Sequence, residues 1–82
     1  MTETVIHTKL QNILVANFNI EENGLIWEQS LVELHPNFKI LEYLVFLEQL
    51  LNKEFRCKIP LLENISPEIH TPNHIVSLIK SL

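Results

Sequence analysis

Glycine and cysteine are almost absent from this sequence, and each shortage excludes a class of protein. Among 82 residues, Gly24 is the single glycine and Cys57 the single cysteine. One glycine excludes collagen-like repeats and glycine-rich phosphate-binding loops, and it argues against a β fold that needs many tight turns. One cysteine excludes an internal disulfide framework, so the cytoplasm, a reducing compartment, is the expected location.

Aspartate is missing altogether, and basic residues are scarce. All ten acidic side chains are Glu, against six from Lys and Arg, which gives a formal net charge of −4. The phosphates of nucleic acids select clustered Lys and Arg, so we expect no nucleic-acid partner. A basic protein surface is the better electrostatic match.

Long apolar runs are also missing. No stretch approaches the roughly 20 residues needed to span a bilayer, and residues 1–4 lack the basic start of a signal peptide. We therefore expect no membrane span. Hydrophobic residues still make up 46% of the chain, which is enough for a folded core. A chain of 82 residues has no room for a second core, so residues 1–82 are predicted to form a single domain.

Four prolines divide the chain into segments that read as helices, because proline removes a backbone donor and disfavours helix before it. The first predicted helix runs from Glu3 to Phe18, where apolar residues recur at helical spacing. A polar turn follows at residues 19–24. Residues 25–34 hold too many apolar side chains for a solvated linker. We expect an ordered loop there, lying over the core, that can hold a short helical turn.

The central predicted helix runs from Asn37 to Arg56, with Asn37 as its N-cap. At about 100° per residue, one face carries the predicted core side chains Ile40, Leu44, Leu47, Leu51 and Phe55. Residues 59–63 form an apolar connector, a single helical turn begins at Ser66, and a final helix begins after Thr71. The final helix has an apolar side made by Ile75, Val76, Leu78, Ile79 and Leu82. The predicted fold class is therefore all-α, a small helical bundle.

Three stretches of the sequence resemble the acyl carrier protein family, which includes peptidyl and D-alanyl carrier domains. Ser30-Leu31-Val32-Glu33-Leu34 resembles the segment that enters the carrier's second helix. Leu47 through Phe55, followed by Lys58-Ile59-Pro60, resembles the end of that helix, and Thr71-Pro72-Asn73-His74-Ile75 resembles the start of the last one. The resemblance covers residues 30–82. It implies a four-helix bundle with a long ordered loop between helices 1 and 2.

The carrier pattern is broken at its modification site. After the loop leucine, carriers place Gly, a variable residue and Asp-Ser-Leu, and the Ser carries the phosphopantetheine arm. In this sequence Asn37 falls where the Asp stands and Phe38 where the Ser stands. No Ser or Thr occurs from residue 31 to residue 65. We therefore expect no phosphopantetheine and no other cofactor.

The resemblance and this departure together predict a non-catalytic pseudo-carrier. It would act as a binding or scaffolding module in fatty-acid, polyketide or nonribosomal peptide synthesis. Expected partners are enzymes or carrier-like proteins of that pathway, and a heterodimer or homodimer is one form of such a contact. The alternative is a working carrier whose arm sits on an atypical serine, Ser30 or Ser66. No acid–base or nucleophile constellation appears, so an enzyme is not expected.

The central predicted helix carries more apolar surface than a core face needs. Tyr43, Phe46 and Leu50 form a second stripe, and the whole apolar arc covers about 260° of the helical wheel. An arc of little more than about 100° is enough to face a core. The resemblance also implies partner recognition on this helix and at its entrance, where His35 and Asn37 lie. These five residues are the predicted partner-binding site.

His70, His74 and Cys57 are the remaining candidates for chemistry. The histidines have the four-residue spacing of a helical metal pair, but Pro72 lies between them and no further ligands stand nearby. We therefore predict structural or surface roles for both, and no metal site. Cys57 has no catalytic signature, and its place at a helix end is typical of a small buried hydrophobic side chain.

Overall fold

The first helix, α1 (Glu3–Phe18), begins and ends where its apolar spacing predicts. The computed structural model describes residues 2–82. Thr2 caps the helix, because its Oγ1 accepts a hydrogen bond from the backbone N–H of Val5 at 3.3 Å. Asn19 ends it in the left-handed conformation, with φ of 56°. The side chains on the buried side are Ile6, Leu10, Ile13, Leu14 and Phe18.

The segment between the long helices is ordered and contains three short turns of helix, which confirms the predicted loop. They are the 3₁₀ turn η1 (Glu22–Gly24), the single-turn helix α2 (Leu31–Leu34) and the 3₁₀ turn η2 (Pro36–Lys39). A capping box begins α2, since Ser30 Oγ accepts from the Glu33 N–H and the Glu33 carboxylate accepts from the Ser30 N–H, both at 3.3 Å. Leu31 is fully buried below this turn.

The central helix, α3 (Leu41–Phe55), begins four residues later than predicted. Pro36 starts its own 3₁₀ turn, and Ile40 is extended, with φ of −87° and ψ of 123°, so the helix cannot run through it. The prediction that Asn37 caps the helix is therefore wrong. Ile40 is 44% exposed, so its predicted place in the core is also wrong. The other four predicted core residues, Leu44, Leu47, Leu51 and Phe55, are buried.

The C-terminal third contains one short helix that was expected to be a connector and one long helix that was predicted. The short helix is α4 (Leu61–Asn64), where Leu61 is buried. The turn expected at Ser66 is present, because its carbonyl accepts from the backbone N–H groups of Ile69 and His70 at 3.1 and 2.8 Å. The long helix is α5 (Pro72–Lys80), capped by Thr71 as predicted. Its buried face is formed by Ile75, Val76 and Ile79, whereas Leu82 is exposed.

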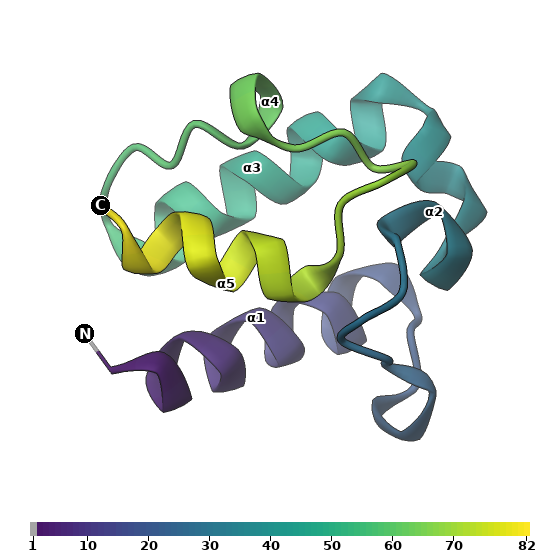
Figure 1. Cartoon of the computed structure of the whole chain (residues 1–82), viewed down its shortest axis with the longest axis horizontal. Helices are drawn as coiled ribbons and strands as arrows, with labels where there is room; N and C mark the ends of the chain where they lie inside the picture. Colours follow the sequence, from purple (N-terminus) through teal and green to yellow (C-terminus); the bar gives the residue numbers. More distant parts are fainter. Residues whose placement is uncertain (1) are drawn as a thin grey trace.

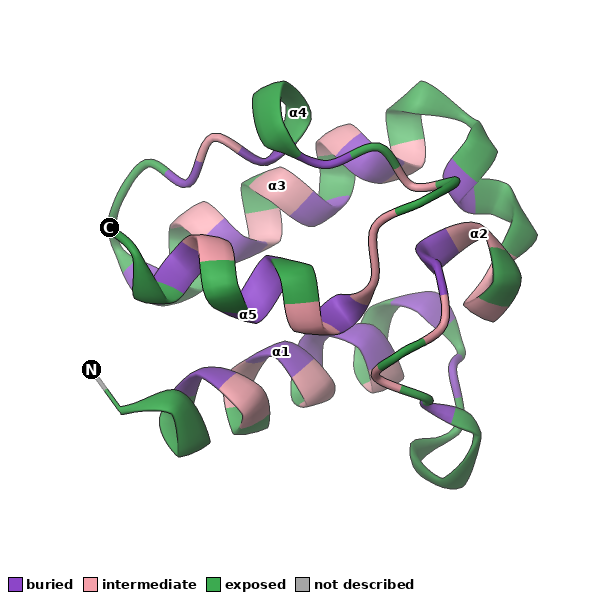
Figure 2. Ribbon diagram, viewed as in Figure 1, coloured by how far each residue is buried: buried purple, intermediate pink, exposed green. Residues whose placement is uncertain are grey.

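The arrangement of these elements leaves α2, η2 and the start of α3 together at one end of the molecule (Figure 1). α1 packs on both α3 and α5, α3 and α5 each pack on α4, and α2 packs on η2. Figure 2 shows the buried residues on the inward sides of the three long helices. No strand occurs in residues 2–82, which confirms the all-α class. No helix within that range is both long and apolar enough to cross a bilayer.

Candidate protein-binding site at the start of α3

Phe38 lies in the core. Its side chain is 1% exposed, and its ring centroid is 5.0 Å from that of Phe18 and 5.5 Å from that of His35. The 3₁₀ turn η2 turns this ring inward, while its neighbours Asn37 and Lys39 are exposed. This position therefore presents no reactive group and no open surface at the entrance to α3.

The two serines considered as atypical modification sites have different surroundings. Ser30 is 7% exposed, and its hydroxyl is engaged with Glu33 in the capping box of α2. Ser66 is exposed and begins the turn before α5. The Ser30 hydroxyl is thus engaged, whereas Ser66 is exposed, and the carbonyl of the next residue, Pro67, accepts from the Val32 N–H of α2 at 3.0 Å.

His35 is the least satisfied polar side chain of this end of the molecule. It is half-buried, and its ring lies 6.2 Å from Phe18, 5.5 Å from Phe38 and 5.9 Å from Tyr43, measured between centroids. Its Nδ1 is buried and has no hydrogen-bond partner among residues 2–82. His35 therefore packs among the aromatic rings at this end of the molecule, whereas Asn37 is exposed.

The predicted stripe on α3 is divided between the surface and the core. Phe46 is 43% exposed, whereas Tyr43 and Leu50 are half-buried and pack against the core. Leu41, at 63% exposure, and Ile40 extend the apolar surface to the very start of the helix. The apolar surface on α3 is thus concentrated in its first half.

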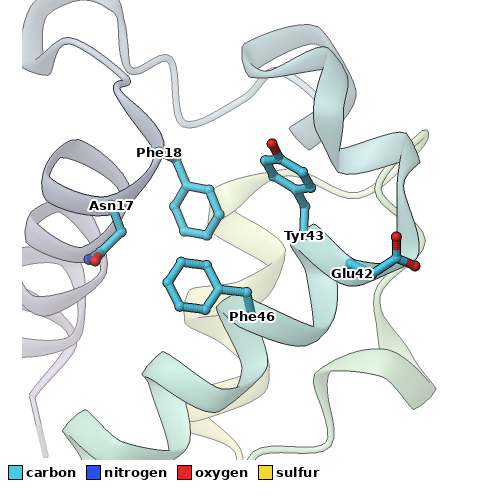
Figure 3. Close-up of a pocket in the computed structure, with 5 residues that line it drawn as sticks. All are labelled: Asn17, Phe18, Glu42, Tyr43 and Phe46. Atoms are coloured by element: carbon cyan, nitrogen blue, oxygen red, sulfur yellow. The ribbon is translucent and has the colours of Figure 1, made fainter.

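A hollow of about 330 Å³ opens beside Phe46 (Figure 3). Its lining residues come from two helices: Asn17 and Phe18 from the end of α1, and Glu42, Tyr43 and Phe46 from α3. The rings of Phe18 and Phe46 point toward one another, with centroids 5.6 Å apart. Glu42 stands at the edge with its carboxylate turned outward.

The sequence prediction found only part of this site. Asn17 and Phe18 lie outside the predicted set, because the approach of α1 to α3 is a tertiary contact with no local signal. Glu42 lies outside it because a charged residue is not part of the apolar stripe. Ile40, predicted in the core, precedes α3 and is exposed, as is Leu41 at the first position of the helix. Tyr43 and Phe46 are the predicted residues that the structure brings together in the hollow.

The other candidate residues have structural surroundings. Nδ1 of His70 accepts from the Ser66 N–H at 2.8 Å, and Nδ1 of His74 accepts from the Thr71 N–H at 2.9 Å in the capping box of α5. No group of three or more His, Cys or Glu side chains that could hold a metal ion is found between residues 2 and 82. Cys57 is exposed, so the prediction that it is buried is wrong.

Comparisons with protein-family models, with curated proteins and with solved structures give no match for this chain. Its function is therefore inferred from its residues and their geometry.

Proposed function

We propose that this chain is a non-catalytic, carrier-like module that binds proteins of an acyl-handling pathway and carries no phosphopantetheine. The pathway class is fatty-acid, polyketide or nonribosomal peptide synthesis. Support comes from the order of elements: a long first helix, an ordered loop, a central helix, a short helix and a capped final helix. In this proposal α1, α3, α4 and α5 correspond to the four helices of the carrier bundle.

The burial of Phe38 is the observation that carries the proposal. A carrier needs a nucleophilic hydroxyl at the start of its second helix, reachable by a transferase. Here the corresponding side chain is an aromatic ring that is 1% exposed and packed against Phe18. A carrier-like fold that lacks its reactive hydroxyl can act only through the contacts that its surface makes.

The surface that supports partner binding is the apolar start of α3. Apolar side chains that stay exposed on a small domain commonly mark contact sites for another protein. Phe46 is such a side chain, and Tyr43 and Leu50 continue its stripe toward the core. Ile40 and Leu41 are further exposed apolar side chains where α3 begins. Asn37 and the half-buried His35 are the polar groups at the entrance to the helix. An enzyme or another carrier-like protein of the pathway is the proposed partner.

The proposal is tested by incubating the chain with coenzyme A and a broad-specificity phosphopantetheinyl transferase, followed by intact-mass analysis. An authentic carrier in the same reaction is the positive control. We expect the control to gain the mass of the arm and this chain to stay unchanged. A gain of that mass, mapped to Ser30, Ser66 or any other residue, would overturn the proposal in favour of a working carrier.

A further inference from the structure

The aromatic walls of the hollow beside Phe46 favour a cationic group. Phe18, Tyr43 and Phe46 line it; the Phe18 ring is 3% exposed, so Phe46 and Tyr43 supply the accessible ring surface. The faces of such rings attract cations that approach within about 6 Å. The volume of about 330 Å³ is at the lower end of the roughly 300–1,000 Å³ found for ligand pockets. A single long side chain therefore fits it better than a helix or a strand.

The polar groups at the edge of the hollow are mainly hydrogen-bond acceptors. One N–H of the Asn17 side-chain amide donates to the carbonyl of Ile13 at 3.0 Å, which leaves its Oδ1 and its second N–H open. The carboxylate of Glu42 is exposed, and no group within residues 2–82 forms an ion pair or hydrogen bond with it. The Tyr43 hydroxyl can accept as well as donate. The one charged group of this set, the Glu42 carboxylate, is complemented by a cationic ligand that donates hydrogen bonds.

The charge of the surrounding sequence acts in the same direction. Between residues 20 and 50 the acidic side chains are Glu21, Glu22, Glu28, Glu33, Glu42 and Glu48. Lys39 is the one basic residue of that segment. Glu33 and Glu48 accept hydrogen bonds within the fold, and Glu42 is the acidic side chain that lines the hollow. An excess of acidic residues in this segment speeds the approach of a basic partner.

We propose that the hollow formed by Asn17, Phe18, Glu42, Tyr43 and Phe46 binds the guanidinium group of an arginine side chain on the partner protein. This inference rests on the proposed function as a protein-binding module. A guanidinium is planar, stacks on aromatic rings and carries five N–H donors with no acceptor. Its apolar stem can lie on Phe46 while the head reaches the Glu42 carboxylate at the edge. An ammonium is more strongly hydrated and cannot stack, so lysine is the poorer match.

The test is an NMR titration with N-acetyl-arginine amide, in which N-acetyl-citrulline amide serves as the uncharged, isosteric control. We expect the arginine compound to shift the ring signals of Phe46 and Tyr43 and the side-chain amide signal of Asn17. Phe46→Leu, which keeps an apolar side chain but removes the ring, should weaken that binding roughly two- to fivefold. Glu42→Gln should weaken it by up to about fivefold. Glu63→Gln, on α4, is the matched control and should bind like the wild type.

Three results would overturn the inference: equal binding of the citrulline compound, no shift at the hollow, or unchanged binding in both Phe46→Leu and Glu42→Gln. A fourth result would overturn the identity of the group that occupies the hollow. The chain's single arginine, Arg56, is exposed, so a second copy could supply the guanidinium. If sedimentation shows self-association that Arg56→Gln abolishes, the occupant is this chain itself, and the partner assignment is wrong. None of these outcomes involves phosphopantetheine transfer, so each is distinguishable from failure of the proposed function.

Discussion

Replacement of Phe38 by alanine should be one of the most damaging single changes in this chain. The side chain is 1% exposed, and its ring packs 5.0 Å from Phe18 and 5.5 Å from His35. Removing a buried Phe ring costs about 3–5 kcal/mol, through lost transfer free energy and the cavity left behind. A domain of this length has a free energy of unfolding of about 4–12 kcal/mol. Phe38→Ala should therefore remove a large part of the total stability.

The matched control is Phe46→Ala, which removes the same ring from a side chain that is 43% exposed. Because the Phe46 ring is only about half buried, its removal loses less apolar burial than removal of the Phe38 ring, together with the contact to Phe18. We therefore expect the free energy of unfolding to fall by about 1–2 kcal/mol. The assay is urea unfolding of both variants, followed by circular dichroism. A loss for Phe38→Ala no larger than that for Phe46→Ala would refute the placement of Phe38 in the core. Because Phe38 is buried, Phe38→Ser should destabilise the fold, and this loss should prevent the substitution from giving a working carrier.

Three further predictions concern the core of α3, its surface and the cap of α5. Truncating Leu47 or Leu51 to Ala should cost about 2–5 kcal/mol in urea unfolding, because both are fully buried, and an unchanged melting temperature would contradict this. Phe46→Glu should keep the helical circular-dichroism signal yet weaken association with the native partner in a pull-down by about 2 kcal/mol or more, and unfolding of this variant would place Phe46 in the core. His74→Ala should lower the free energy of unfolding by about 0.5–2 kcal/mol. His74→Gln should stay close to the wild type, because Gln at this position completes a capping box, and equal losses of both variants in thermal unfolding would exclude a capping role.

Helix ends with strong local signals could be predicted from the sequence. Thr71 and Pro72 place a capping hydroxyl and a proline at the first turn of α5, and the structure begins the helix there. The spacing of apolar residues within α3 likewise predicts correctly that Leu44 and Leu47 face the core. In these cases the neighbours along the chain supply most of the information that the backbone needs.

The errors arose where tertiary contacts decide the backbone. The apolar period of α3 extends back through Ile40, but burial of Phe38 against Phe18 favours a separate 3₁₀ turn and leaves Ile40 extended. The helix α4 has no capping side chain of its own, and the Leu62 N–H donates instead to the Glu48 carboxylate on α3, at 2.9 Å. Such a contact cannot be deduced from a single stretch of sequence.

Only some of the residues that line the hollow beside Phe46 could be predicted from the sequence. Tyr43 and Phe46 of α3 belong to the stripe that the width of the apolar arc predicts, whereas Glu42 lies outside that stripe. The α1 residues of the hollow, Asn17 and Phe18, lie at the end of a helix whose approach to α3 has no local signature. The chemistry of the hollow, rings with acceptors at the edge, emerges only when both helices are placed together.

We propose above that the chain works through its surface and bears no prosthetic arm. This can be tested on the chain isolated from its native host, where the physiological transferase has had access to it. Its intact mass should be the mass of the unmodified polypeptide. A mass increased by a phosphopantetheine arm, free or acylated, would contradict it.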